Sequence, residues 1–338
     1  MLGRLWSRVK ALFFRLFRRR PEPGRFETDS QSSVRGWLAG SPWIWPQRDY
    51  LLYLPQGYMG LPAAPLLVLI HGCRQTPEEI AAATRITALA DTLGCFVLMP
   101  RQSRRANAWG CWNWFDTATA SGWGESAIVA AQIDAVHRKY RIDGRRVFVA
   151  GMSAGGGLAS AVALRRPELV AGAFVHSGIA CGVASGAQAA FDVMKRGAED
   201  DNFKEIAREI RARTKAESLP VALVAIQGGD DSVVAPVNAC QLVRQFLILN
   251  GHPGADAGAD SELPPPDRSE ATLVSEARTI TTSEWLIDGQ PVVRHVLVGG
   301  LGHAWSGGDD SHPYNDPRPP DATALLAAFV RGELTSRT

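Results

Sequence analysis

The sequence predicts an α/β fold in which a mostly parallel sheet is covered by helices on both faces. Short apolar runs alternate along the chain with stretches of helical pattern, and this alternation is typical of parallel strands joined by crossover helices. Several of the runs are apolar at almost every position, as expected for strands that are buried on both faces. A chain of 338 residues is long enough to build one large domain of this kind.

The individual elements can be assigned in chain order. Residues 43–58 are expected to form an edge strand and a turn, and residues 65–72 a buried strand. A helix is expected over 77–93, because Thr76 is a good N-cap and Gly94 can end the helix. The further expected elements are helices at 124–140 and 320–331, strands at 95–100, 145–153, 171–178, 221–229 and 292–300, and an exposed low-complexity insertion at 252–270.

Composition and charge are those of an ordinary globular protein. The chain is 46% apolar and 21% charged, which excludes the disordered and fibrous classes. Its net charge of +2 is unevenly spread, because residues 1–20 hold seven basic and no acidic side chains. The other 318 residues carry 29 basic against 34 acidic side chains. No nucleic-acid partner is expected, since a nucleic-acid-binding domain usually presents a basic face.

Residues 1–20 are predicted to form a basic amphipathic helix. Eight apolar residues fall in an arc of roughly 140° on a helical projection, and most of the arginines point the other way. Such a helix suits an anionic membrane or polymer-granule surface; a packed terminal helix or a mispredicted start codon are the alternatives. Arg15 interrupts the apolar run, so no cleavable signal peptide is evident, and the stretch is too short and too charged to span a bilayer. Residues 21–40, with Pro21 and Pro23 near their start, are expected to be a linker.

A candidate nucleophile lies where one predicted strand ends. Gly151-Met152-Ser153-Ala154-Gly155 fits the G-x-S-x-G pattern, in which a strand turns sharply into a helix and presents a serine hydroxyl at the apex. The glycines are needed because larger side chains two residues before and after the serine would collide with the turn. The competing interpretation is a tight structural turn with an ordinary serine.

An acid and a histidine are expected from the loops after two later strands. Asp230 and Asp231 follow one of these strands, and His303 follows the other. Such loops gather at the carboxyl ends of the strands, and with Ser153 they give the chain order serine, aspartate, histidine. The histidine would take the serine's proton, and the carboxylate would orient the imidazole. Because the two aspartates are adjacent, the pattern leaves the choice between them open.

Two backbone N–H groups are expected to stabilise an oxyanion at this site. One belongs to Ala154, directly after the serine, and the other to Cys73, in the loop that follows the first buried strand. His71, in the same loop, is interpreted as structural. The five cysteines show no metal-ligand spacing, and neither a metal nor an organic cofactor is expected. Cys73 and Cys111 lie in two loops that flank the site, and we hypothesise that they form a disulfide.

Five motifs in one order resemble those of the PHB depolymerase-type esterases of the α/β-hydrolase superfamily. They are HGCRQT (71–76), AWGCWNWFD (108–116), GMSAGG (151–156), GGDDSVVAPVN (228–238) and GLGHAWSGG (300–308). The resemblance implies that residues 41–335 form an α/β-hydrolase catalytic domain. Counted from Gly228, the family spacing places the acid at Asp231, and so favours it over Asp230.

The resemblance also implies an activity. It points to a serine carboxylic-ester hydrolase that works through an acyl-enzyme, with Ser153, Asp231 and His303 as catalytic residues. Family members act on poly(3-hydroxyalkanoate) chains or on acyl and feruloyl groups of polysaccharides. We therefore expect an ester or polyester substrate, with hydroxybutyrate esters first and a feruloyl or acetyl xylan esterase as the alternative. A peptidase would share this machinery, and a non-catalytic surface-binding protein on a hydrolase scaffold is the rival from another class.

Four tryptophans lie in or near the expected site loops: Trp109, Trp112, Trp114 and Trp305. We expect them to form the walls of an apolar acyl or polymer site, except that two of the four are expected to pack in the core. Two features depart from the family. Gln227 stands where a histidine or similar residue is usual, and we expect it to have little mechanistic weight. Family members of this kind are extracellular, whereas the arginine-rich start points to association with a membrane or granule surface in the cytoplasm.

Overall fold

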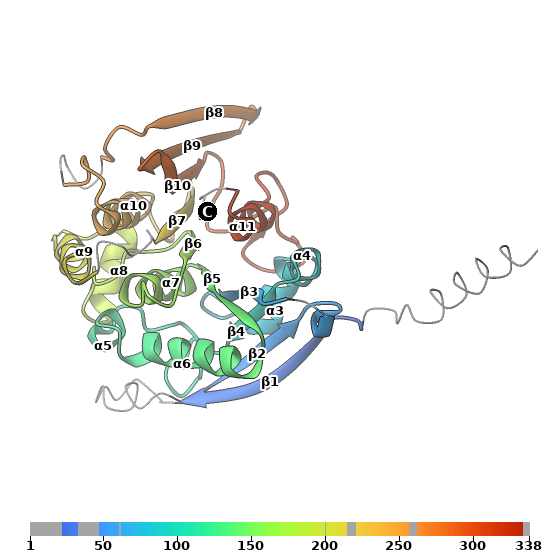
Figure 1. Cartoon of the computed structure of the whole chain (residues 1–338). Helices are drawn as coiled ribbons and strands as arrows, with labels where there is room; N and C mark the ends of the chain where they lie inside the picture. The colour runs from blue at the N-terminus through green and yellow to red at the C-terminus, as the bar shows by residue number, and fades with distance from the viewer. Residues whose placement is uncertain are drawn as a thin grey trace, which may run out of the picture.

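The fold is built on one large sheet. The computed structural model describes residues 22–32, 47–60, 62–199, 201–214, 221–256 and 262–333. Within these ranges, ten strands form the sheet in the order β1-β2-β4-β3-β5-β6-β7-β10-β9-β8 (Figure 1). The strands are β1 (Arg25–Ser32), β2 (Gln47–Leu54), β3 (Ala64–Ile70), β4 (Phe96–Pro100), β5 (Ile142–Met152), β6 (Gly172–His176), β7 (Ala222–Gly228), β8 (Arg268–Ser275), β9 (Arg278–Ile287) and β10 (Gln290–Val298). A small parallel pair, β11 (Trp305–Ser306) and β12 (Asn315–Asp316), lies beside the sheet's carboxyl end.

The central strands are parallel and the outer ones antiparallel. Parallel ladders join β4, β3, β5, β6, β7 and β10 in that order. Antiparallel ladders add β2 and β1 at one edge and β9 and β8 at the other. The prediction of a mostly parallel central sheet is confirmed, and every predicted strand between residues 65 and 300 is present.

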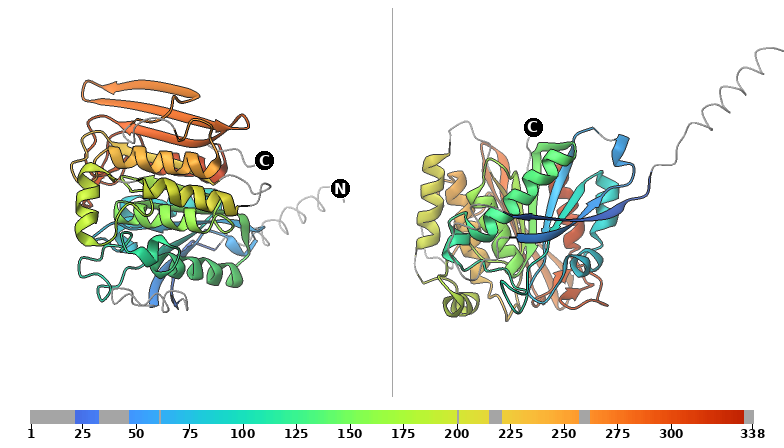
Figure 2. Two further views of the ribbon diagram at one scale, coloured as in Figure 1. Left: turned by 90° about the vertical axis from the view of Figure 1, so that its left-hand side faces the viewer. Right: turned by 90° about the horizontal axis from the view of Figure 1, so that it is seen from below.

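Helices cover both faces of the sheet, as predicted (Figures 1 and 2). Those in the described residues are α3 (Pro77–Ala83), α4 (Ile86–Leu93), α5 (Thr117–Ala120), α6 (Gly124–Lys139), α7 (Ala154–Arg165), α8 (Ala187–Arg196), α9 (Asn202–Arg213), α10 (Val237–Asn250) and α11 (Ala322–Arg331), with a 3₁₀ turn at Tyr58–Gly60. On β3, Leu66 and Val68 pack in the core under α6, α7 and α10, whereas Leu67 and Leu69 pack in the core under α3, α4 and α11. Alternate residues of one continuous apolar run thus serve two cores.

The single helix predicted over 77–93 is two helices. Thr76 begins α3 with a capping box, in which its hydroxyl accepts from the Glu79 N–H and the Glu79 carboxylate accepts from the Thr76 N–H. Arg85, between the two helices, adopts a left-handed backbone conformation (φ 54°), which interrupts the helix before α4 begins. Gly94, also left-handed, closes α4 as expected.

Two predictions at the sheet edges are wrong, and the bounds of a third extend into a strand. Residues 25–32 of the predicted linker form β1, which pairs with β2 along its whole length. Strand β2, which was predicted to be an edge strand, therefore has a neighbouring strand on each side, β1 and β4. The predicted insertion at 252–270 runs into β8, the first strand of a hairpin that sequence analysis missed (Figure 2). All eight residues of β8 are exposed, so this strand carries no hydrophobic periodicity to detect.

The prediction of an amphipathic helix over residues 1–20 lies outside the described residues. In the part of the chain that the structure describes, no helix is both long enough and apolar enough to cross a bilayer.

A buried ion pair joins three segments near the sheet's β2 side. Glu125, in the first turn of α6, is fully buried and accepts from Arg48 Nη2 at 2.9 Å and from Gln102 Nε2 at 2.6 Å. The backbone N–H of Asn113 donates to the second carboxylate oxygen at 2.7 Å. Arg48 Nε in turn donates to Gln102 Oε1 at 2.7 Å. Strand β2, the segment after β4 and the tryptophan-rich segment therefore meet at one carboxylate.

Removing this carboxylate should destabilise the fold strongly. We expect Glu125→Leu to lower the free energy of unfolding by about 3–5 kcal/mol, because the buried Arg48 guanidinium would lose the carboxylate that it pairs with. Glu205 is a matched control, since it lies in the first turn of α9 but is exposed. Glu205→Leu should cost less than about 1 kcal/mol. Urea unfolding of both variants measures the difference, and similar losses for the two would contradict this role of Glu125.

Candidate active site

Ser153 stands alone between β5 and α7 in a strained conformation. Its φ of 57° and ψ of −124° lie in a region that non-glycine residues rarely adopt. A Cβ on Gly155 would lie 2.2 Å from the Ile70 carbonyl oxygen, and one on Gly151 would lie 2.3 Å from the Gly155 carbonyl oxygen. Both glycines are therefore required by close backbone contact. Such strain persists where a function depends on it, which favours the nucleophile interpretation over an ordinary turn.

The loop after β3 lies against this turn. In the sheet, β3 is flanked by β4 on one side and β5 on the other, so the chain leaves β3 and β5 in opposite directions. Ligands bind at such switch points in parallel sheets. A Cβ on Gly72 would lie only 3.6 Å from the Cβ of Ser153. The two loops expected to hold the oxyanion are thus in contact.

Asp231 and His303 come from the ends of β7 and β10, which are paired in parallel. His303 Nδ1 donates to Asp231 Oδ2 at 2.8 Å. The other carboxylate oxygen accepts the N–H groups of Val233 at 2.9 Å and Val234 at 2.8 Å. Asp230 is exposed to solvent, whereas Asp231 is 4% exposed. The structure therefore places Asp231, and not its neighbour, against the histidine.

The environment of Asp231 keeps it ionised. Burial alone would raise its pKa, but the hydrogen bond from His303 and those from the Val233 and Val234 amides lower the pKa below its ordinary value. A carboxylate held in this way can orient an imidazole and stabilise its protonated form.

Two residues that contact Asp231 or His303 were not identified as part of the site from the sequence. Gln227 is fully buried, and its Nε2 donates to the carbonyls of Gly228 and Val234 and, at 3.4 Å, to Asp231 Oδ2. Gln227 thus helps to hold the acid loop, a structural role that sequence analysis did not assign to it. Tyr314 follows the histidine loop and packs edge-on to His303, with ring centroids 6.5 Å apart. No motif or periodicity marks this tyrosine in the sequence.

His176 links the serine turn to the histidine loop. Its carbonyl accepts the Ser153 N–H at 3.0 Å, and its Nε2 accepts the Ser306 N–H at 3.3 Å. Its ring stacks on Trp305 with centroids 5.2 Å apart. The histidine that ends β6 thus positions both loops without lining the cavity between them.

The two expected oxyanion donors are available. Ala154 is the first residue of α7, where a backbone N–H has no partner within the helix. In the loop after β3, the N–H groups of Gly72, Arg74 and Gln75 are all hydrogen-bonded. Among the described residues, the Cys73 N–H has no acceptor. This donor is left free beside Ser153, as an oxyanion site requires.

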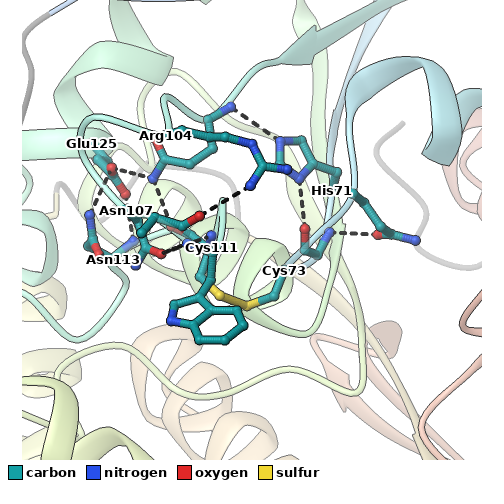
Figure 3. Close-up of a disulfide and its surroundings, with 12 residues drawn as sticks. His71, Cys73, Arg104, Asn107, Cys111, Asn113 and Glu125 are labelled. Atoms are coloured by element: carbon teal, nitrogen blue, oxygen red, sulfur yellow. Dashed lines mark hydrogen bonds between the residues drawn. A yellow bond between two sulfur atoms is a disulfide. The ribbon is translucent and has the colours of Figure 1, made fainter.

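A disulfide joins Cys73 to Cys111, as hypothesised (Figure 3). It ties the loop after β3 to the tryptophan-rich segment, and the Arg74 N–H reinforces the link by donating to the Trp109 carbonyl at 3.0 Å. Asn107 orders that segment, because its Oδ1 accepts the N–H groups of Trp109 at 3.0 Å and Cys111 at 3.3 Å. The Cys73 amide is thus held by a covalent bond at its own residue.

A cavity of about 410 Å³ opens onto Ser153 and His303. Its walls are mainly apolar and include Trp109, Phe191, Met194, Val233 and Tyr314. Apart from Trp109, these wall residues come from α8 and from loops that the sequence does not single out. In the part of the chain that the structure describes, no group of three or more histidine, cysteine or acidic side chains is placed to hold a metal ion.

Sequence analysis expects two of the four tryptophans to line the site and two to pack in the core, but of the four only Trp109, which is 61% exposed, lines the Ser153 cavity. The other three are in the core. Trp112 is fully buried beside His71, Trp114 packs against Gly157 of α7, and Trp305 packs on His176. Their large apolar rings fill space beneath the loops, which is the usual role of buried tryptophan.

Three histidines are buried in their neutral form. Burial lowers the pKa of His71 to about 4, of His176 to about 3 and of His295 to about 4. His71 donates from Nδ1 to the Gly72 carbonyl and accepts the Gln102 N–H at Nε2, which supports its interpretation as structural.

Stability should therefore fall as the pH drops from about 6.5 toward 4. In this window the unfolded chain binds protons that the folded chain does not, so the stabilisation present above pH 6.5 is lost. Each histidine contributes a slope of up to about 1.4 kcal/mol per pH unit. Urea unfolding at pH 7, 6 and 5 tests this, with exposed His137→Gln as a control that keeps the slope. An unfolding free energy that is constant from pH 7 to 5 would refute it.

Loss of the disulfide should destabilise the protein by about 2–4 kcal/mol, because the unfolded chain gains freedom. We expect the Cys73→Ala/Cys111→Ala variant to melt at the same lowered temperature with or without a reductant, and the wild type to fall to that temperature only when it is reduced. Cys240→Ala, which removes a cysteine outside the disulfide, should keep the reductant-sensitive melting of the wild type. Differential scanning calorimetry measures all three, and a wild type insensitive to full reduction would contradict the prediction.

Comparison with known proteins gives a consistent family. The family model described as Esterase PHB depolymerase matches residues 48–262, which include Ser153 and Asp231. Poly(3-hydroxyalkanoate) depolymerase C of Paucimonas lemoignei is 31% identical over 196 residues, which are 57% of this chain and 47% of that protein. Feruloyl esterase B of Neurospora crassa is 30% identical over 138 residues, which are 41% of this chain and 46% of that protein. The chain thus spans about half the length of these curated relatives.

A solved structure shares the fold. Acetyl xylan esterase from Aspergillus awamori superposes with a TM-score of 0.62 at 22% sequence identity, covering 82% of this chain and 94% of that one. The match to the family model extends over more than half of the chain, and the sheet carries the serine turn, the acid loop and the histidine loop at its carboxyl edge. The chain belongs to the PHB depolymerase family of esterases and has the α/β-hydrolase fold.

Proposed function

We propose that the protein is a serine carboxylic-ester hydrolase that acts through an acyl-enzyme on hydroxyalkanoate esters. The observation that carries this proposal is the 2.8 Å hydrogen bond between His303 and Asp231, with His303 and Ser153 lining one cavity. Family membership supports ester hydrolysis as the reaction class.

The proposed reaction uses the two ends of the imidazole separately. Because His303 donates its Nδ1–H to Asp231, its Nε2 has a lone pair that can accept the Ser153 hydroxyl proton. The serine oxygen then attacks the ester carbonyl, and the N–H groups of Ala154 and Cys73 stabilise the resulting oxyanion. Collapse breaks the bond to the alcohol, which takes the proton from His303 and leaves. Water, activated by the same histidine, hydrolyses the acyl-enzyme and restores the serine.

The cavity walls support an apolar acyl chain. Phe191, Met194 and Val233 offer aliphatic and aromatic surface next to Ser153, as a hydroxyalkanoate unit would require. One relative is named as a poly(3-hydroxyalkanoate) depolymerase, and others are named as feruloyl or acetylxylan esterases. A non-catalytic scaffold would have no need of the strained Ser153 or of the bonded acid and histidine.

The catalytic assignment predicts large losses at three positions. Ser153→Ala, His303→Ala and Asp231→Asn should each lower kcat for p-nitrophenyl butyrate by about 10⁴-fold or more. Asp230→Asn is the matched control, because the adjacent carboxylate is exposed, and it should stay within about threefold of wild type. Equal losses for the two aspartates would overturn the assignment. Labelling by a fluorophosphonate should occur in wild type and be absent in Ser153→Ala.

The substrate assignment is tested by a rate screen. Hydroxybutyrate oligomers, methyl ferulate, acetylated xylan and a peptide would be compared with the same enzyme preparation. We expect the highest kcat/KM for hydroxybutyrate oligomers, since the cavity next to Ser153 is mainly apolar. A faster reaction with the ferulate or xylan ester would show that the substrate is an ester group on a polysaccharide. Cleavage of the peptide alone would indicate a peptidase.

A further inference from the structure

Arg74 is the one permanently charged side chain among the described residues that line the Ser153 cavity. No aspartate or glutamate lines this cavity with it. Arg74 is exposed at the cavity wall, one residue beyond Cys73. A lone cation in a largely apolar site has no role in binding a neutral alkyl chain, and it calls for an anionic group on the ligand.

The guanidinium of Arg74 is held in place by stacking. It lies over the Trp109 ring, 4.6 Å from the ring centroid. Stacking uses the flat face of a guanidinium and leaves the N–H groups at its edge free to bind a carboxylate in bidentate fashion. In the described ranges of the chain, no carboxylate forms an ion pair with Arg74, and no acceptor is bonded to its side chain.

The two loops that make this stack are rigidly joined. The Cys73–Cys111 disulfide and the hydrogen bond from the Arg74 N–H to the Trp109 carbonyl both connect them. The left-handed backbone of Arg74 (φ 61°) turns the chain at this point. The cation is therefore positioned before any ligand arrives, so little freedom is lost when it binds.

Trp109 also lines a second cavity, of about 660 Å³. Arg104 and Arg105 line this cavity with a single acid, Asp116. Arg104 Nη1 donates to the Ala108 carbonyl at 3.2 Å, which places its guanidinium beside the segment that carries Trp109 (Figure 3). Positive charge thus flanks the tryptophan in both cavities.

We propose that Arg74, stacked on Trp109, is a binding site for a free carboxylate at the alcohol end of the ester. The proposal rests on the proposed function. In an oligoester of a hydroxy acid, the free carboxylate belongs to the terminal unit, which is part of the leaving alcohol when the last ester bond is cleaved. A polymer interior or a capped ester offers no such group. The substrate class is then short, carboxylate-terminated oligoesters rather than neutral polyester.

Matched dimers test the proposal. The 3-hydroxybutyrate dimer would be supplied as its free acid and as its methyl ester, which differ only in the charge of the terminal group. For wild type, we expect kcat/KM for the free acid to exceed that for the methyl ester by about 10- to 100-fold, and the ratio to fall as salt is added. In Arg74→Gln the ratio should fall to near one. Arg145→Gln, an exposed arginine on β5 at the end remote from Ser153, should keep the wild-type ratio.

A binding measurement tests the carboxylate site separately from the esterase activity. The Ser153→Ala protein would be titrated with each dimer by ligand-observed NMR, where we expect saturable binding of the free acid that is lost in Ser153→Ala/Arg74→Gln. Hydrolysis of both dimers by wild type at equal rates, with equal binding, would overturn the carboxylate site and leave the esterase standing. Selective binding of the free acid with no hydrolysis of either dimer would keep the site and overturn the esterase. Neither binding nor hydrolysis would overturn both.

Discussion

The buried carboxylate of Glu125 is the interaction on which the arrangement of the site depends. It is surrounded by donors from β2, from the segment after β4 and from the tryptophan-rich segment. Asn113 extends the network, because its Oδ1 accepts from Asn107 Nδ2 at 2.9 Å. Asn107 then holds the amides of Trp109 and Cys111. A charge that would be costly to bury alone is satisfied by groups that fix a long irregular loop.

The site is assembled from two pairs of strand ends, and β6 lies between them. The loops after β3 and β5 supply Ser153 and the two N–H groups proposed to hold the oxyanion, and the loops after β7 and β10 supply Asp231 and His303. At the end of β6, His176 contacts both halves through its carbonyl and its ring. Burial keeps this ring neutral, so its Nε2 can act as an acceptor at a position where a charged imidazole would have only donors.

The parts of the molecule that could be predicted from sequence are those where local pattern and packing agree. The central strands are buried on both faces and carry continuous apolar runs, and the elbow glycines are demanded by contacts of about 2 Å that permit no side chain. The edge strands β1 and β8 could not be predicted, because most of their described side chains are exposed and neither strand carries an apolar run. Trp112, Trp114 and Trp305 could not be separated from Trp109 either, since a tryptophan has the same sequence signal whether it fills a core or lines a cavity.

The hairpin of β8 and β9 lies between the acid and the histidine in the chain, but outside both in space. Strand β10 returns directly beside β7, so Asp231 and His303 are neighbours whatever length of chain separates them. The hairpin is added on the far side of β10, as an extension of the sheet margin (Figure 2). Its inner strand β9 also contacts the histidine loop, because the Thr279 carbonyl accepts the Gly299 N–H at 2.8 Å and Arg278 forms a buried ion pair with Asp316. The outer strand β8, exposed along its whole length and paired only with β9, is thus the part of this margin that can change with the least effect on the histidine loop.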